Sequence, residues 1–253
     1  MAKRLEGTTA LITGASSGIG EATALALAAE GADVALAARR RERLDTLAAK
    51  IGALGVRALV LEADITDERQ ASEIVETTVA KLGRLDTLVN NAGVMLLGPI
   101  PNADVTEWTR MIDLNVVALM RCTHAALPHL LRAAETGPRK VADVVNISSV
   151  AGRVARAGAG AYNATKWGVN AFSEALRQEI TEKHVRIGVV EPGFVETELQ
   201  SHNRPEVQDA IRSRFAFDGP LQAQDIADAI AYVVTRPRHV AINEVLIRPT
   251  QQV

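Results

Sequence analysis

The sequence has very little cysteine and few aromatic residues. Its 253 residues include a single cysteine, Cys122, which excludes an intramolecular disulfide framework and suits a reducing compartment. Aromatic residues make up 3% of the chain, with two Trp, two Tyr and four Phe. The core must therefore be built from Ala, Val, Leu and Ile, and a tyrosine in this chain needs a specific reason.

The sequence also has no large excess of charge and no long apolar run. The formal net charge is −2 and the pI is about 6.2, so no basic field attracts nucleic acid or anionic lipid. No uncharged apolar run reaches the roughly 18 residues of a membrane span, and no signal-peptide pattern opens the chain. We therefore expect a cytoplasmic protein without nucleic-acid or membrane partners. The five His and one Cys have no metal-ligand spacing, so no metal is expected.

Short aliphatic runs alternate with longer amphipathic segments along the whole chain. The runs predict seven strands, at Thr8–Thr13, Asp33–Ala38, Val56–Leu61, Thr87–Asn90, Val141–Ile147, Val185–Val190 and Glu244–Ile247. The segments between them predict helices at Gly18–Glu30, Arg41–Gly52, Asp67–Leu82, Glu107–Ala134, Ala161–Glu182 and Gln224–Thr235. Most runs are continuously apolar, as in parallel strands that helices cover on both faces.

This alternation predicts an α/β protein with one domain over residues 1–253. We expect a doubly wound Rossmann fold, with a seven-stranded parallel sheet flanked by helices on both faces. Two stretches read as irregular, Ala134–Lys140 and Gly193–Pro220. The second is long for a connector, so we predict a substrate loop at about 193–220.

Glycines cluster directly after the first predicted strand. The segment Thr13-Gly-Ala-Ser-Ser-Gly-Ile-Gly20 opens straight into a predicted helix. Glycines let the backbone approach a pyrophosphate, and the helix N-terminus adds N–H groups and a partial positive charge. A purely structural turn also uses glycine, but the position at the start of the first βαβ unit favours phosphate binding.

The end of the second predicted strand indicates which nicotinamide cofactor is bound. NAD sites usually place an acidic residue there, whereas this chain has Ala37-Ala-Arg-Arg-Arg41. Arginine forms planar, bidentate contacts with phosphate, so Arg39 and Arg40 predict NADP(H). The alternative is a solvated basic helix start, which is how we interpret Arg41.

Tyr162 and Lys166 lie four residues apart at the start of a predicted helix, so their side chains share one face. An ammonium beside a phenol favours the phenolate. Bringing a tyrosine pKa from about 10 to neutrality takes about 4 kcal/mol, which a cation and an oxidised nicotinamide together could supply. Such a tyrosine can donate or accept a proton. The alternative is an amphipathic Tyr beside a surface Lys.

Other polar residues follow strand ends, where ligands bind in doubly wound sheets. Ser148-Ser149 follows the fifth predicted strand, and a serine hydroxyl there can hydrogen-bond a substrate carbonyl. Asn90-Asn-Ala-Gly93 ends the fourth strand. Asn115 lies among apolar residues of a predicted helix, so its amide must be hydrogen-bonded, either structurally or in a water relay. Each of these features also fits an ordinary turn or a structural role.

Together these motifs resemble the short-chain dehydrogenase/reductase family in the same order over essentially the whole chain. The resemblance implies a catalytic tetrad of Asn115, Ser149, Tyr162 and Lys166. Tyr162 would be the acid/base, Ser149 would hold the carbonyl, Lys166 would bind the nicotinamide ribose, and Asn115 would hold a relay water. It also implies a cofactor site made of Gly14, Ser16, Ser17, Gly18, Ile19, Gly20, Arg39, Arg40, Asp64, Ile65, Asn91, Ala92, Gly93, Tyr162, Lys166, Pro192, Gly193, Val195 and Thr197.

Shorter stretches, among them Val94–Pro99 and Trp108–Asp113, resemble the branch that contains clavulanic-aldehyde reductase and NADP-dependent serine and 3-hydroxy-acid dehydrogenases. The segments Glu135–Lys140 and His202–Asp218 depart from the first of these, which leaves the natural substrate open. The resemblance also implies a homotetramer, or a dimer.

We therefore expect reversible hydride transfer between NADP(H) and a carbonyl or alcohol substrate. The alternatives are a dehydrogenase of a small 3-hydroxy acid such as serine, or, more remotely, a nucleotide-sensing protein without turnover. Candidates for the lining of an apolar pocket are Met95, Leu96, Gly152, Arg153, Val154, Phe194 and Leu199. Four arginines, each of which also fits a solvated surface, are candidates for binding a substrate carboxylate: Arg153, Arg204, Arg212 and Arg214.

Overall fold

Seven parallel strands form one sheet in the order β3-β2-β1-β4-β5-β6-β7. The computed structural model describes residues 3–215 and 219–252, without the side chains of Asn102 and Arg214. The strands are β1 Thr9–Thr13, β2 Asp33–Ala38, β3 Ala58–Glu62, β4 Thr87–Asn90, β5 Ala142–Ile147, β6 Val185–Pro192 and β7 Glu244–Ile247. Every residue of β1, β4, β5 and β6 is buried, which explains their mostly apolar sequences. The predicted seven-stranded Rossmann-type sheet is confirmed.

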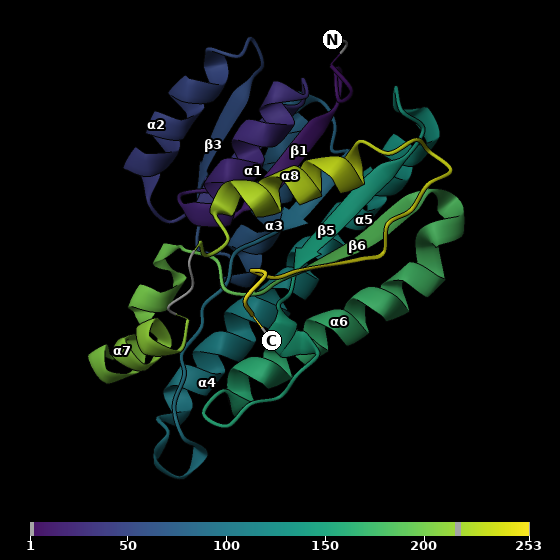
Figure 1. Cartoon of the computed structure of the whole chain (residues 1–253). Helices are drawn as coiled ribbons and strands as arrows, with labels where there is room; N and C mark the ends of the chain where they lie inside the picture. Colours follow the sequence, from purple (N-terminus) through teal and green to yellow (C-terminus); the bar gives the residue numbers. More distant parts are fainter. Residues whose placement is uncertain (1–2, 216–218, 253) are drawn as a thin grey trace.

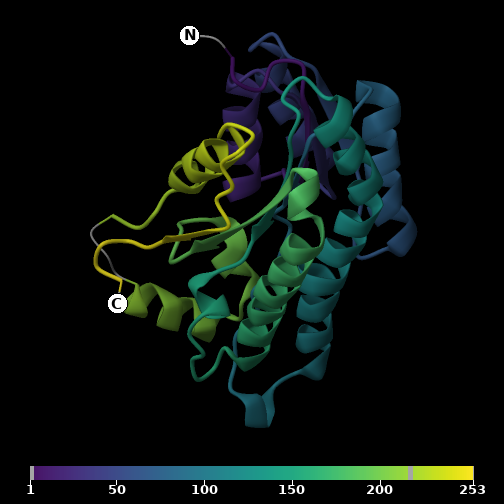
Figure 2. The same cartoon turned by 90° about the vertical axis from the view of Figure 1, so that its right-hand side faces the viewer.

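Two layers of helices cover the sheet (Figures 1 and 2). The helices are α1 Gly18–Ala29, α2 Arg41–Gly52, α3 Glu68–Leu82, α4 Val105–Ile112, α5 Leu119–Thr136, α6 Gly160–Ile180, α7 Pro205–Arg214 and α8 Ala223–Val234. Helices α1, α2 and α8 pack on one face, while α3, α5 and α6 pack on the other. Among residues 3–215 and 219–252, no helix is long and apolar enough to cross a membrane.

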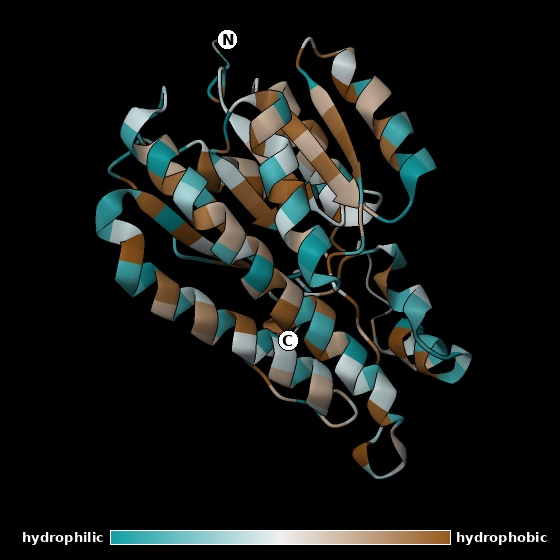
Figure 3. Cartoon of the chain, turned by 180° about the vertical axis from the view of Figure 1, so that it is seen from behind, coloured by the Kyte–Doolittle hydropathy of each residue, from teal (hydrophilic) through white to brown (hydrophobic). Residues whose placement is uncertain are grey.

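The core on each face of the sheet is almost entirely aliphatic. Leu27, Leu44 and Ile230 pack against one face, and Ile74 and Leu130 against the other. Seen from behind, the α3–α5–α6 layer alternates hydrophobic and hydrophilic residues along each helix, as amphipathic helices do (Figure 3). Small apolar side chains let the helices lie close to the sheet, and among the described residues Phe172 is the one aromatic residue packed against these two clusters.

The predicted helix Glu107–Ala134 is in fact three segments, which is a correction to the sequence analysis. Helix α4 begins after Asp104, whose carboxylate accepts a hydrogen bond from the Thr106 backbone N–H at 2.9 Å. A π-helical turn over Asp113–Ala118 then joins α4 to α5. Within this turn the Asn115 side chain hydrogen-bonds the backbone of Val94, in the segment that follows β4. This tertiary contact accounts for a turn that sequence periodicity could not predict.

The stretch 193–220, which we predicted to be irregular, contains two helical elements. A short 3₁₀ helix, η5, runs over Glu198–His202, and α7 follows from Pro205. Proline is favoured at the first position of a helix because its missing N–H has no intrahelical partner there. Residues 216–218 of the predicted loop lie outside the described part of the chain.

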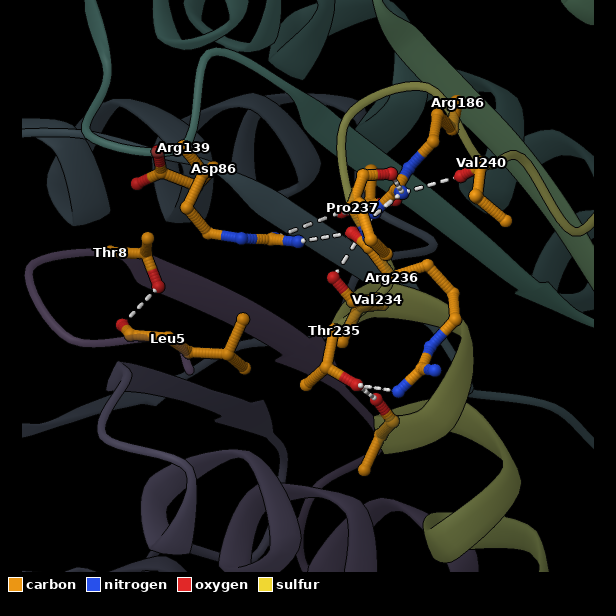
Figure 4. Close-up of polar contacts among 12 residues, drawn as sticks. Leu5, Thr8, Asp86, Arg139, Arg186, Val234, Thr235, Arg236, Pro237 and Val240 are labelled. Atoms are coloured by element: carbon orange, nitrogen blue, oxygen red, sulfur yellow. Dashed lines mark hydrogen bonds and ion pairs between the residues drawn. The ribbon is translucent and has the colours of Figure 1, made fainter. Parts of the chain in front are cut away.

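A network of charged groups lies at the amino ends of the strands, opposite the edge where ligands bind in this fold. Arg186 on β6 forms a bidentate ion pair with Asp143 on β5, with Nε–Oδ1 at 2.7 Å and Nη2–Oδ2 at 2.9 Å. The same guanidinium donates to the carbonyl oxygens of Val234, Arg236, Pro237 and Val240. Figure 4 shows Arg186 and Arg139 converging on the loop after α8. This network ties that loop to the sheet.

Candidate active site

A cavity of about 870 Å³ opens at the carboxyl ends of the strands. Residues that follow four neighbouring strands line it: Gly14 after β1, Asn91 after β4, Ser148 after β5 and Gly193 after β6. Because all strands are parallel, their carboxyl ends meet at the same edge, where doubly wound sheets bind ligands. The volume lies in the range of ligand-binding clefts.

The glycine-rich turn is packed tightly against the segment that follows β4. Gly14 has a φ of +67°, and a Cβ added there would stand 2.8 Å from the Ala92 Cα. The Asn91 side-chain amide donates to the carbonyl oxygens of Thr13 at 3.0 Å and of Gly14 at 3.2 Å. A Cβ at Gly20 would collide with the Gly14 carbonyl oxygen. These contacts explain Gly14 and Gly20 by backbone packing, and they hold the start of α1 at the cavity.

Arg40 connects the glycine-rich turn with the segment after β6. Its Nη2 donates to the hydroxyls of Ser16 at 2.9 Å and Ser17 at 2.7 Å, and its Nη1 pairs with Glu198 Oε2 at 2.7 Å. Arg39 extends further into solvent, with Nη1 4.0 Å from Asp64 Oδ2. Both arginines therefore stand at the β2 end of the cavity, the position that the sequence predicted.

Tyr162 and Ser149 face each other at the centre of the cavity wall. Tyr162 lies on the first turn of α6, is only 7% exposed and packs with Val94, Leu96 and Met111. Its hydroxyl lies near enough to the Ser149 side chain for that side chain to lower the pKa of Tyr162. Ser149 begins a 3₁₀ turn, with its hydroxyl accepting from the Ala151 N–H at 3.1 Å. The two hydroxyls thus form a polar pair in largely apolar surroundings.

Lys166 lies one turn after Tyr162 and is equally buried. Its Nζ donates to the Ile147 carbonyl oxygen at 2.8 Å and stands 5.8 Å from the centre of the Tyr162 ring. Burial raises the pKa of Tyr162 to about 12, although the nearby Ser149 side chain opposes the rise. Burial lowers the pKa of Lys166 to about 8. The sequence analysis predicted a lowered tyrosine pKa from a cation and an oxidised nicotinamide together, and with the cofactor bound this stays a prediction. In the protein alone desolvation, which the sequence does not show, raises the pKa of Tyr162.

The lowered Lys166 pKa makes stability depend on pH. Between about pH 8 and 10.5 the unfolded chain holds the Lys166 proton and the folded chain does not, so the free energy of unfolding rises with pH. The full gain is about 3 kcal/mol, at 1.36 kcal/mol per pKa unit. In urea titrations, Lys166→Met is expected to lack this rise, whereas Lys183→Met, at an exposed position, keeps it. Parallel curves for wild type and Lys166→Met across this window would contradict the prediction.

Asn115 lies behind the cavity wall. It is 2% exposed, its Oδ1 accepts from the Val94 N–H at 2.8 Å, and its Nδ2 donates to the Val94 carbonyl at 2.8 Å and to the Thr165 hydroxyl at 3.2 Å. The side chain therefore joins the π-helical turn to α6 and to the segment after β4. Its predicted role with a relay water stays a prediction.

The structure brings nearly all of the predicted site residues to this cavity. Of the predicted set, the two that lie outside its lining are Gly20 and Asn115, both described residues that pack just behind it. Among the predicted pocket residues, Met95, Val154, Phe194 and Leu199 line the cavity. Leu96, Gly152 and Arg153, which are also described, lie outside the lining.

Three of the four arginines considered for carboxylate binding form ion pairs within the protein. Arg153 bridges Glu191 on β6 and Glu244 on β7, Arg204 lies 3.7 Å from Glu107, and Arg212 lies 3.1 Å from Asp209. The side chain of Arg214 lies outside the described part of the chain. Carboxylate recognition by Arg153 is therefore disfavoured, because its guanidinium already holds two carboxylates.

Sequence reasoning missed several residues at the cavity. Phe215 at the end of α7 stacks on Phe194, with ring centres 4.8 Å apart and planes 12° apart. Arg43 reaches Glu198 from the first turn of α2, and Arg156 is among the residues that line the cavity. The scarcity of aromatic residues could have drawn attention to Phe215, but nothing in the local sequence indicates that Glu198 meets α2.

Comparisons with known proteins agree with this geometry. The family model for short chain dehydrogenases matches residues 8–208. The chain is 38% identical, over 98% of its length, to glycine betaine reductase ATRR of Emericella nidulans, but it spans only 19% of that protein. It is 34% identical to an uncharacterized oxidoreductase of Staphylococcus aureus strain USA300, covering 95% of this chain and 96% of the other. A closed form of serine dehydrogenase complexed with NADP+ superimposes with a TM-score of 0.86 and 32% identity, covering 97% of this chain and 96% of that one.

Proposed function

Since this chain belongs to the short-chain dehydrogenase family, we propose that it is an NADP(H)-dependent oxidoreductase that interconverts a carbonyl compound and its alcohol. The observation that carries the proposal is the meeting of Tyr162, Ser149 and Lys166 at one cavity, beside the glycine-rich turn and the start of α1. An acid/base phenol, a hydroxyl donor and a cation at one place are the groups that carbonyl reduction requires.

In the reductive direction, Ser149 and Tyr162 hold the substrate carbonyl oxygen between their hydroxyls. The raised pKa of Tyr162 keeps its phenol protonated at neutral pH, so the proton is ready for transfer to the oxygen. As the carbonyl carbon receives hydride, the electron pair of the C=O π bond moves to the oxygen, which takes the Tyr162 proton. The resulting phenolate then regains a proton from solvent. Lys166 would hold the nicotinamide ribose and would favour the transient phenolate by its charge. Asn115 fixes the wall behind these groups.

The residues around the cavity fit a dinucleotide phosphate. Gly14 and Gly18 both have positive φ, at +67° and +54°, so the backbone before α1 stays open to a close-lying pyrophosphate. Arg39 and Arg40 line the cavity at the end of β2, where they would hold a ribose 2′-phosphate, and the lining residues Asp64 and Ile65 would lie beside the adenine. When bound, NADPH supplies the hydride for reduction, and NADP+ accepts it in oxidation.

Cofactor choice is tested by comparing three neighbouring arginines. Arg39→Ala and Arg40→Ala are each expected to raise the Kd of NADPH by about 10-fold or more, because a charged hydrogen bond to phosphate contributes about 1.5–3 kcal/mol. The Kd of NADH should change little. Arg41→Ala is the control, since Arg41 pairs with Asp45 in the same helix at 3.5 Å. Fluorescence titration gives all the constants, and an unchanged NADPH/NADH ratio in both variants would contradict selection by these arginines.

We assign to the substrate the part of the cavity that is lined by Met95, Val154 and Leu199, and we call it the substrate side. The stacked Phe194 and Phe215 add a flat apolar surface, so this part of the cavity favours an apolar carbonyl compound. The second candidate is a small 3-hydroxy acid such as serine, which is supported by the likeness to serine dehydrogenase and by Arg156 in the lining. Initial rates with a panel of ketones, aldehydes and 3-hydroxy acids, each with NADPH/NADP+ and NADH/NAD+, decide between them. A homotetramer or dimer is part of the proposal, and sedimentation tests it.

A further inference from the structure

The carboxylate of Glu198 lies between Arg40, at the β2 end of the cavity, and Arg43, in the first turn of α2. Its Oε2 is 2.7 Å from Arg40 Nη1, and its Oε1 is 2.7 Å from Arg43 Nη1. Hydrogen bonds from these guanidinium groups lower the pKa of Glu198 to about 2, so the carboxylate is ionised at neutral pH. One anion therefore bridges two cations where the proposed cofactor carries its 2′-phosphate.

Glu198 belongs to a segment that reaches both ends of the cavity. It is the first residue of η5, and its neighbour Thr197 lies over the start of α1, where a Cβ on Gly18 would stand 3.2 Å from the Thr197 methyl carbon. Leu199 and His202 of the same segment line the cavity. Helix α7 follows directly and projects from the body of the fold beside α4 (Figure 1). A movement of Glu198 would therefore also move residues that line the substrate side of the cavity.

The Arg40 guanidinium has two sets of partners, the serine hydroxyls of the glycine-rich turn and the Glu198 carboxylate. Its Nη2 is fixed to Ser16 and Ser17 of the glycine-rich turn, and its Nη1 is fixed to Glu198. An incoming phosphate needs the guanidinium groups that Glu198 holds, and two anions side by side repel. Phosphate offers three charged oxygens against two, so it forms more charge-assisted hydrogen bonds. The Glu198 pairs are also half-exposed, and such pairs are weak, so exchange is easy.

We propose that Glu198 is a specificity residue that occupies the 2′-phosphate position, and that a 2′-phosphorylated nucleotide displaces it from Arg40 and Arg43 and so frees η5 from α2. This inference rests on the proposed NADP(H) function. A nucleotide without the 2′-phosphate leaves Glu198 in place. The segment that borders the substrate side thereby distinguishes the two cofactors before any substrate binds.

Calorimetric titration with 2′,5′-ADP and with 5′-ADP tests the competition without turnover. Glu198→Gln keeps the size of the side chain and removes its charge, so it is expected to bind 2′,5′-ADP about 3- to 10-fold more tightly than wild type, while 5′-ADP binding stays the same. Glu196→Gln is the matched control. Glu196 is two residues earlier in the same segment, and its carboxylate accepts from the Gln222 amide at 3.0 Å. The control should bind both probes like wild type.

Hydrogen exchange follows the segment itself. In the wild type, 2′,5′-ADP is expected to speed exchange of the amides in 198–202, and 5′-ADP is not. If Glu198→Gln binds 2′,5′-ADP no more tightly than wild type, while wild type still prefers it to 5′-ADP, the competition is refuted and the cofactor proposal stands. If wild type shows no preference between the probes, the NADP(H) proposal fails, and this inference fails with it.

Discussion

Tyr162→Phe is expected to lower kcat for carbonyl reduction by about 10²- to 10⁴-fold, the contribution that a positioned proton donor usually makes. The phenyl ring keeps the packing against Val94 and Met111, so the change removes a single hydroxyl. The Kd of NADPH should stay within about 2-fold, because binding free energy held in the glycine-rich turn and the arginines is untouched. Stopped-flow absorbance at the NADPH band measures the rate, and fluorescence titration measures the binding.

The chain supplies its own control, because it has only one other tyrosine. Tyr232 on α8 is 55% exposed, and its ring lies 4.1 Å from the Arg236 guanidinium. Tyr232→Phe should retain wild-type kcat. If Tyr162→Phe keeps more than a tenth of the activity, another group donates the proton, and the proposed role of Tyr162 is incorrect.

Arg186→Leu is expected to lower the free energy of unfolding by about 3–5 kcal/mol, the usual cost of leaving one partner of a buried ion pair without the other. Asp143 is 1% exposed and would keep only Arg139, at 3.5 Å. The carbonyl oxygens of Val234, Arg236, Pro237 and Val240 would also each lose a hydrogen bond from Arg186. That of Arg236 keeps its bond from Arg139, and that of Pro237 keeps its bond from the Val240 N–H. For a chain of this size the loss corresponds to a fall in Tm of roughly 6–20 °C.

Two further variants make this result specific. Arg186→Lys keeps the charge but cannot span both carboxylate oxygens and the carbonyls, so an intermediate loss is expected. Arg177→Met removes a surface pair with Glu174 and should change Tm by about 1 °C or less. Urea unfolding followed by circular dichroism gives the three values. Equal stability of Arg186→Leu and Arg177→Met would show that the network contributes nothing net.

Residues near the start of β5 stabilise the fold, whereas residues just after its end lie at the proposed active site. Asp143, near its start, belongs to the ion-pair network, and Ser148 and Ser149 follow its end at the cavity. Arg186→Lys, if it folds, should therefore keep the kcat of the wild type.

Sequence periodicity predicted the sheet and most helices because parallel, doubly covered strands have a continuous apolar pattern. Strand β2 and strand β7 have the predicted bounds, and β3 is shifted to Ala58–Glu62. The π-helical turn at Asp113–Ala118 was missed because it depends on Asn115 reaching Val94, 21 residues earlier. Helix α7 had a local signal, Pro205 after Arg204, that the length of the supposed loop concealed.

The site was predictable to the extent that each residue follows a strand end or shares a helix face. Tyr162 and Lys166 lie one turn apart on α6, and Ser149 follows β5, so the topology brings them together. The pKa of Tyr162 was not predictable, because it depends on how completely the fold excludes water. The pairing of Arg153 with Glu191 and of Glu198 with Arg43 was not predictable either, since the partners lie 38 and 155 residues apart.

The single cysteine allows the rate at which α3 and α5 separate to be measured by chemical labelling. Cys122 on α5 is fully buried against α3, with its thiol 3.9 Å from the Ala71 carbonyl oxygen, and burial raises its pKa to about 12. A thiol reagent reaches it only after α3 and α5 part, and the thiolate that reacts forms only then. Each labelled molecule therefore records one opening of that helical layer, so mass spectrometry can time such openings in the unmodified protein, even inside a cell.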